Sequence, residues 1–227
     1  MTSRLRGLGI VLVLIGIGFL IGGGYTFWKV QEGQASLSDF SAAQDVTLSY
    51  NEEGQLVDRG EAAGAEAIMA LLTDDWGYPV ARGDLNPDDP VVNTATEYMY
   101  QMATVAYHTL HGTQTVVLPE DVEYEGQLFK AGTYEVPIDG RYFSQLDRQH
   151  PLEGPAREMA WSGTAHALIA ELGVGTTTAQ MLQIGLAVAA LFAGIGATVI
   201  LTGGGLIWAT RRVEEPVPVL RPAALPA

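Results

Sequence analysis

The chain has 227 residues and a formal net charge of −14, with 26 aspartates and glutamates against 12 lysines and arginines. This charge argues against nucleic-acid binding by phosphate neutralisation. Because the chain contains no cysteine, disulfide-stapled domains, cysteine-ligated zinc, iron–sulfur clusters and thiol catalysis are excluded.

The first predicted element is an uncharged, apolar run at residues 7–28. As a helix rising ~1.5 Å per residue it would be about 33 Å long, enough for a hydrocarbon core of ~30 Å. Arg4 and Arg6 precede it, as in a signal peptide, but the run is longer than the ~7–15 residues of an ordinary signal core. No clean small-residue cleavage motif follows it. We therefore expect an uncleaved transmembrane helix.

A second uncharged run covers residues 181–209 and predicts a second transmembrane helix. Two arginines precede the first run, and Arg211 and Arg212 follow the second, so the positive-inside rule places both termini in the cytoplasm. The arginine-over-lysine bias, with abundant alanine, glycine and valine, suggests a GC-rich bacterial genome, so the expected location of the two spans is the bacterial plasma membrane. The expected organisation is a cytoplasmic N-terminus (1–6), a transmembrane helix (7–28), an extracytoplasmic domain (29–179), a second transmembrane helix (180–209) and a cytoplasmic proline-rich tail (210–227).

The central region is acidic and mixed in predicted secondary structure. Residues 30–179 hold 24 acidic residues against six lysines and arginines, as expected of a translocated domain. Apolar periodicity, capping residues and turn signals predict its elements. They are a strand at 46–50, a helix at 61–72 behind an Asp58/Glu61 capping box, a short strand at 76–80, a helix from a Thr94/Glu97 capping box to His111, a strand at 113–118, a β-meander at 122–138 and a helix at 156–172. The fold class expected is therefore an α+β domain, of about three helices and a small antiparallel sheet, flanked by two transmembrane helices.

Small residues recur at helical spacing in both apolar runs. Gly18 and Gly22 form a GxxxG pair in the first, and four residues repeat at intervals of four in the second: Gly185, Ala189, Ala193 and Ala197. Small residues in register allow helix backbones to approach closely in lipid. We expect a helix–helix contact on this face, with the first span, another copy or another protein as the partner. A short joint at 173–175 is expected to connect the second span, capped by Thr177 and Gln180, to the outer domain.

Three histidines fall on the predicted helices of the outer domain. His108 and His111 share a helix face, and His166 lies on a later helix. If the two helices pack together, the three imidazoles form a set suited to zinc or copper. The alternative is that each ring bonds a neighbouring carbonyl or carboxylate and has a structural role. The sequence requires no cofactor.

No catalytic motif is recognisable in the sequence, and the apolar runs contain no Asp, Glu, Lys, Arg or His that would serve a transport pathway. We therefore expect a non-catalytic integral membrane protein that acts as an assembly or accessory subunit of a membrane complex or as a homo-oligomer. Its partners would be membrane lipid and a membrane protein or a second copy. The alternatives are an extracytoplasmic metal-binding or ligand-sensing domain and a membrane-anchored hydrolase.

Overall fold

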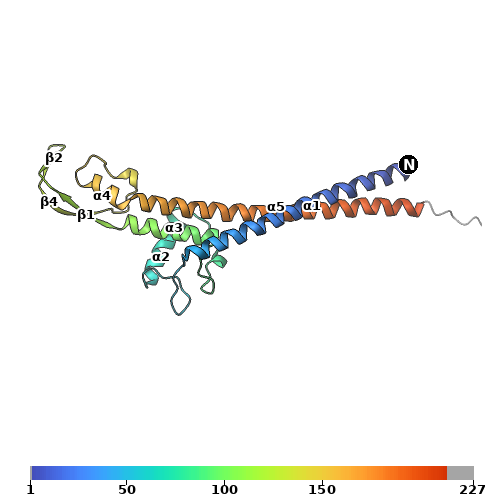
Figure 1. The fold of residues 1–227 in the computed structure, drawn as a ribbon, viewed down its shortest axis with the longest axis horizontal. Helices are drawn as coiled ribbons and strands as arrows, with labels where there is room; N and C mark the ends of the chain where they lie inside the picture. Colours follow the sequence, from blue (N-terminus) through green and yellow to red (C-terminus); the bar gives the residue numbers. More distant parts are fainter. Residues whose placement is uncertain (1, 214–227) are drawn as a thin grey trace, which may run out of the picture. The chain divides into compact units, whose positions relative to one another are not determined.

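The computed structural model describes residues 2–213 and divides them into two compact units. Unit 1 contains residues 2–34 and 182–213, and unit 2 contains residues Ala35–Met181. Two long helices, α1 (Thr2–Gln44) and α5 (Gly163–Val213), contribute to both units (Figure 1). The expected architecture of two long apolar helices flanking a small domain of helices and antiparallel strands is confirmed.

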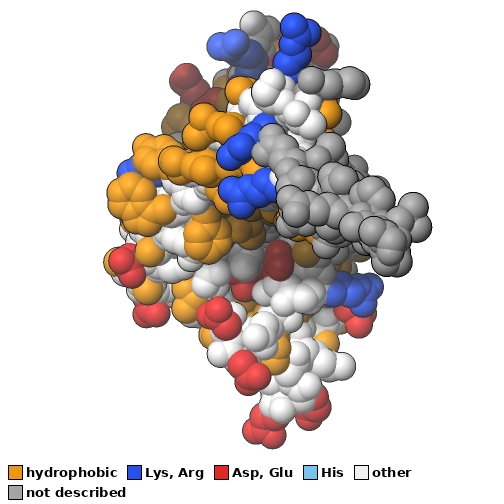
Figure 2. Space-filling model, turned by 90° about the vertical axis from the view of Figure 1, so that its right-hand side faces the viewer, with side chains coloured by type: hydrophobic (Ala, Val, Ile, Leu, Met, Phe, Trp, Pro, Cys, Tyr) orange, Lys and Arg blue, Asp and Glu red, His pale blue; other side chains and the backbone are white. Residues whose placement is uncertain are grey.

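Both long helices have the length and composition that a membrane crossing requires. In the most apolar 18-residue stretch of each, only 11% of the residues are buried. Figure 2 looks onto one end of the molecule and shows hydrophobic side chains on the surface beside lysine and arginine side chains. Helix α1 continues well past residue 28, where the apolar run ends.

Glycines spaced seven residues apart bring α1 and α5 into close contact in unit 1. They are Gly9, Gly16 and Gly23 on α1, facing Gly203, Gly196 and Ala189 on α5. A Cβ added to Gly16 would lie 2.7 Å from the carbonyl oxygen of Gly196, and one added to Gly203 would lie 2.5 Å from the carbonyl oxygen of Gly9. Seven residues are close to two helical turns, so each set lies along one face of its helix. The pairing order makes the two helices antiparallel.

The helical half of unit 2 begins with α2 (Ala62–Ala70), which continues into a π-helical turn, η1 (Leu71–Asp75). A short 3-10 turn, η2 (Arg82–Asp84), precedes α3 (Ala95–Leu110). The Thr94/Glu97 capping box is confirmed, with both of its hydrogen bonds present. The Asp58/Glu61 box was wrong, because Glu61 makes no side-chain cap and Asp58 bonds His108 instead. The strands predicted at 46–50 and 76–80 are replaced by loop with isolated bridges at Thr47 and Tyr50.

The strands of unit 2 form two separate two-stranded ladders. In the first, β1 (Thr113–Leu118) pairs antiparallel with β4 (Gly132–Pro137). In the second, β2 (Val122–Tyr124) pairs with β3 (Gln127–Phe129) through a turn in which Glu125 and Gly126 both have positive φ. The predicted strands and this turn are confirmed, but the meander is wrong. The β2–β3 hairpin is inserted in the chain between β1 and β4, and β4 pairs with β1 instead of with β3.

The last elements of unit 2 differ from the prediction. A 3-10 turn, η3 (Phe143–Gln145), leads to α4 (Glu153–Ala160), and α5 begins after a break at Trp161 and Ser162. The predicted single helix at 156–172 was wrong, because the Trp161 side chain turns into the core and the Ser162 hydroxyl accepts from the Ala165 amide, as an N-cap does. The predicted joint at 173–175 and the cap at Thr177 were also wrong. Helix α5 runs through both without interruption.

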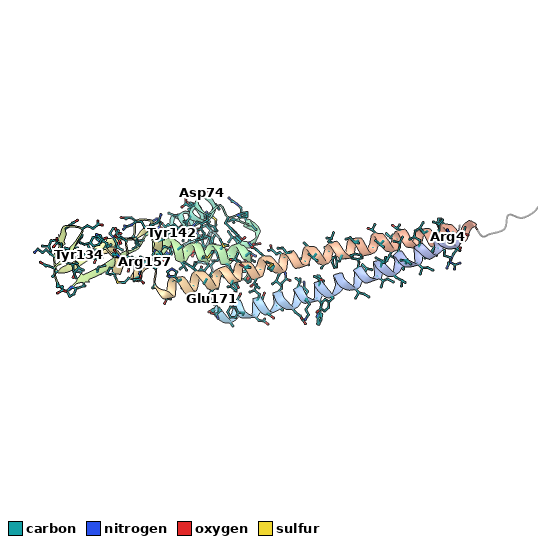
Figure 3. The ribbon with its side chains drawn as sticks, turned by 90° about the horizontal axis from the view of Figure 1, so that it is seen from above. Arg4, Asp74, Tyr134, Tyr142, Arg157 and Glu171 are labelled. Carbon is teal, nitrogen blue, oxygen red and sulfur yellow. The ribbon has the colours of Figure 1, made fainter. Side chains whose placement is uncertain are left out.

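Two clusters of buried side chains make up the core of unit 2, and α3 contributes to both. One cluster, which includes Ile138 and Trp161, joins α3, β1, β4 and α4. The Tyr142 ring stacks on Trp161, and the Arg157 guanidinium lies 3.6 Å from the centre of the Phe143 ring. Figure 3 labels Tyr142 and Arg157. The other cluster joins α2, α3 and α5 around Ile68 and Leu72.

Candidate functional site

An apolar groove of about 350 Å³ lies within unit 2 between three helices. The end of α1, one face of α3 and the start of α5 form its walls, and two loop valines complete it. Its lining is Leu37, Phe40, Ser41 and Gln44 from α1, Tyr98, Gln101 and Val105 from α3, Leu168, Glu171, Leu172, Val174, Gly175 and Thr178 from α5, and Val46 and Val92. The size and the mainly apolar lining are those of a binding site.

Tyr98 holds the three walls of this groove together. Its hydroxyl is 2.7 Å from the Ser41 hydroxyl, and both side chains are buried, so the end of α1 is tied to α3. Its ring lies directly against Gly175 of α5, where an added Cβ would be 2.5 Å from the ring carbon Cε1. The glycine inside α5 therefore has a packing role, because it lets an aromatic ring of α3 approach the helix backbone.

Several large apolar side chains of the groove are open to solvent. Phe40 is 51% exposed, Leu168 is 42% exposed and Val174 is 66% exposed. These residues come from two helices that are far apart in the sequence, and they meet at one concave surface. Exposed apolar patches of this kind mark interaction sites in soluble domains.

The charged residues at the groove are acidic. Glu171 lines it on α5 (Figure 3). Asp39 precedes the lining residue Phe40, and Asp45 lies between two lining residues, and both aspartates are exposed. The segments that form the groove, residues 35–50, 92–111 and 162–181, contain no lysine or arginine. These three segments therefore contribute only negative formal charge to the rim.

A separate group of buried polar side chains lies on α3 and the loop before α2. Glu97 is 1% exposed, and its carboxylate accepts from the backbone amides of Asn93 and Thr94. Burial raises the pKa of Glu97 above its ordinary value. Burial also raises the pKa values of the Tyr50 and Tyr100 phenols, so both stay neutral at ordinary pH. Glu97 and Tyr100 lie in the core, Tyr50 is half-buried, and none of the three lines the groove.

The structure places the predicted metal ligands in separate surroundings. His108 Nε2 lies 2.9 Å from a carboxylate oxygen of Asp58. His111 Nδ1 lies 2.9 Å from the carbonyl oxygen of Tyr107, and His166 Nδ1 lies 3.1 Å from that of Ser162. Within residues 2–213, no group of three or more histidine, aspartate or glutamate side chains is arranged to hold a metal ion.

The predicted helix-packing residues fall on different faces of unit 1. An added Cβ on Gly18 would meet nothing within 4 Å, and one on Gly22 would reach only ordinary contact distance from Phe192. Gly185 lies against Val30, and Ala189 is buried beside Gly23. Ala193 and Ala197 are exposed.

Sequence reasoning missed the residues at which the backbones come closest, which are Gly9, Gly16, Gly23, Gly196 and Gly203. The signal that would have found them is their seven-residue spacing, present in both apolar runs. It also missed the groove, because no motif marks Phe40, Tyr98 or Val174.

No protein-family model, curated protein or solved structure matches this chain. The function is therefore argued from geometry alone. The groove is a concave apolar surface, whereas two ionisable pairs of unit 2 link one structural element to another. Asp58 ties the loop before α2 to α3 through His108, and Arg141 ties the chain after β4 to Glu153 of α4 at 2.6 Å.

Proposed function

We propose that this chain is a non-catalytic integral membrane protein of the bacterial plasma membrane. Helices α1 and α5 cross the membrane, both termini are cytoplasmic and unit 2 is outside. The exposure of the apolar stretches supports this proposal, since an apolar helix in the core of a soluble protein would be mostly buried. The arginines that flank the two stretches support the orientation.

Unit 2 serves as the assembly module of an accessory subunit, and the groove is its docking surface. The observation that carries this proposal is the convergence of Phe40, Leu168 and Val174, all exposed, on one concave surface of an acidic domain. Leaving these side chains in water is unfavourable by ~25 cal/mol per Å² of apolar surface, and a partner would remove that surface from water. Docking through a preformed groove requires no catalytic group, which agrees with the structural use of the ionisable pairs.

The proposal is tested by measuring the mass of the native assembly. The full chain, expressed in its own host and extracted in a mild detergent, is analysed by native mass spectrometry. The groove variant carries Phe40→Gln and Val174→Gln. The matched control carries Leu128→Gln and Met159→Gln, which are exposed to a similar degree (53% and 43%) and lie on β3 and α4, outside the groove.

We expect the wild-type chain and the control variant to have the mass of an assembly, with partner chains or as an oligomer, and the groove variant to have the mass of a single chain. Far-UV circular dichroism checks that both variants keep their helical content. If wild-type chain and groove variant have the same assembly mass, the docking role of the groove is refuted.

A further inference from the structure

We propose that the groove of unit 2 binds an amphipathic helix of a partner protein, one whose apolar face is flanked by lysine or arginine. This inference rests on the docking role proposed above and specifies the chemistry of the partner.

The shape of the groove fits a helix. Its lining residues on α5 extend from Leu168 to Thr178, which is about 15 Å at ~1.5 Å per residue, or nearly three turns. Helix α1 contributes about two turns of lining, from Leu37 to Gln44, and α3 contributes the rest of the helical lining. A trough walled by helices and lined with apolar side chains accepts the apolar face of another helix, whose anchor residues recur at i, i+3, i+4 and i+7.

The negative charge beside the groove favours basic residues on either side of the apolar face of that helix. Glu171 stands in the lining, and Asp39 and Asp45 adjoin lining residues on the α1 side. Unit 2 holds 23 acidic residues and six basic ones, and those six lie outside the three segments that form the groove. A lysine or arginine beside the apolar face of the partner meets these carboxylates, whereas a glutamate there is repelled.

The test uses the absence of cysteine from the chain. The full-length variant Val174→Cys, reconstituted in phosphatidylcholine nanodiscs, is labelled with an environment-sensitive fluorophore. Leu128→Cys, on the β2–β3 hairpin, is the control label at a site of comparable exposure. Three 14-residue peptides are titrated: an amphipathic leucine/lysine helix, a leucine/glutamate helix with the same apolar face, and a scrambled leucine/lysine sequence of equal composition. Empty nanodiscs report binding to lipid.

We expect the leucine/lysine helix to give a saturable blue shift at position 174 and none at 128, with the leucine/glutamate and scrambled peptides binding at least tenfold more weakly. In unlabelled protein, Glu171→Lys should weaken the affinity for the leucine/lysine helix at least fivefold, as measured by calorimetry. Glu66→Lys, which changes the net charge equally on the exposed face of α2, should leave its affinity within twofold.

Other results overturn the inference in distinguishable ways. If the leucine/glutamate helix binds as tightly as the leucine/lysine helix, the charge rule fails while the docking role survives. If no peptide shifts the label at 174 and that label is open to solvent without peptide, the helix-binding inference fails, and the docking role is then decided by the assembly mass. Equal responses at 174 and 128, or equal binding of the scrambled peptide, would mean adsorption by charge alone. A label at 174 that is already shielded in a dimeric protein without peptide would identify a second copy as the occupant.

Discussion

Replacing Gly16 by alanine should separate α1 from α5, whereas the same replacement at Gly18, half a turn away, should not. The added methyl carbon at position 16 would lie 2.7 Å from the Gly196 carbonyl oxygen and 2.6 Å from Cγ1 of Ile200. The isoleucine side chain has room to rotate, but the carbonyl belongs to the backbone, so the two helices must move apart. At Gly18 the methyl group meets nothing within 4 Å.

The magnitude follows from the difference between the two variants. Both substitutions remove a glycine from a helix and gain the same intrinsic helix propensity, ~1 kcal/mol in water. Overpacking of a well-packed contact costs about 1–3 kcal/mol, and only the position-16 variant incurs it. The equilibrium between paired and separated helices should therefore differ between the two variants by about 5- to 150-fold.

The assay uses pyrene labels on cysteines introduced at Ser3 and Ala209, which lie six residues beyond Gly9 and Gly203 along the paired helices. Excimer emission reports that these ends are together, and sodium dodecyl sulfate added to mixed micelles separates them. Gly16→Ala should lose the excimer at a lower dodecyl sulfate fraction than wild type, and Gly18→Ala at the same or a higher fraction. Equal midpoints for the two variants would refute the glycine contact.

Three further predictions follow from unit 2 and the membrane topology. In chemical denaturation, Gly175→Ala should lower the free energy of unfolding of unit 2 by about 1–3 kcal/mol relative to Gly173→Ala. The reason is that the added Cβ at 175 would strike the Tyr98 ring, whereas one at 173 meets nothing within 4 Å. Equal stabilities of the two variants would contradict the packing role of Gly175. Because burial raises the pKa of Glu97, the folded state holds that proton more tightly than the unfolded chain, so wild type should gain stability relative to Glu97→Gln as the pH falls toward 4.5, the ordinary pKa of the group. A wild-type-minus-variant stability that stays constant over this range would show that the buried carboxyl does not titrate there. Protease added to intact spheroplasts should cut unit 2 and spare a tag at either terminus, and loss of a tag would reverse the proposed orientation.

Local sequence signals predicted the elements that are stabilised locally. The Thr94/Glu97 capping box and the apolar periodicity behind it located α3, and the Glu125–Gly126 turn located the β2–β3 hairpin. Predictions failed where packing between distant segments decides the outcome. Gly173 and Gly175 suggested a joint, yet the helix is continuous, and at Gly175 the missing side chain makes room for the Tyr98 ring of α3.

In the candidate site, too, local patterns were predictable from the sequence and contacts between distant segments were not. The histidine spacing on α3 was visible in the sequence, but the ring partners depend on which loop lies beside each histidine, and for His108 that is the loop carrying Asp58. The groove had no sequence signal, because Phe40 and Val174 come from helices more than 130 residues apart in the chain.

The sequence by itself determined the two long apolar helices, the acidic region between them and the ends of the well-capped elements, because hydropathy, charge and capping act over a few neighbouring residues. Only the tertiary structure decided which glycines of α1 and α5 meet, and which apolar side chains of unit 2 remain uncovered. A pattern of small residues shows which faces of a helix permit close approach, and both helices have several such faces. The choice among those faces is made by the register of the two helices, which brings Gly16 opposite Gly196 and leaves Gly18 free of any neighbouring helix.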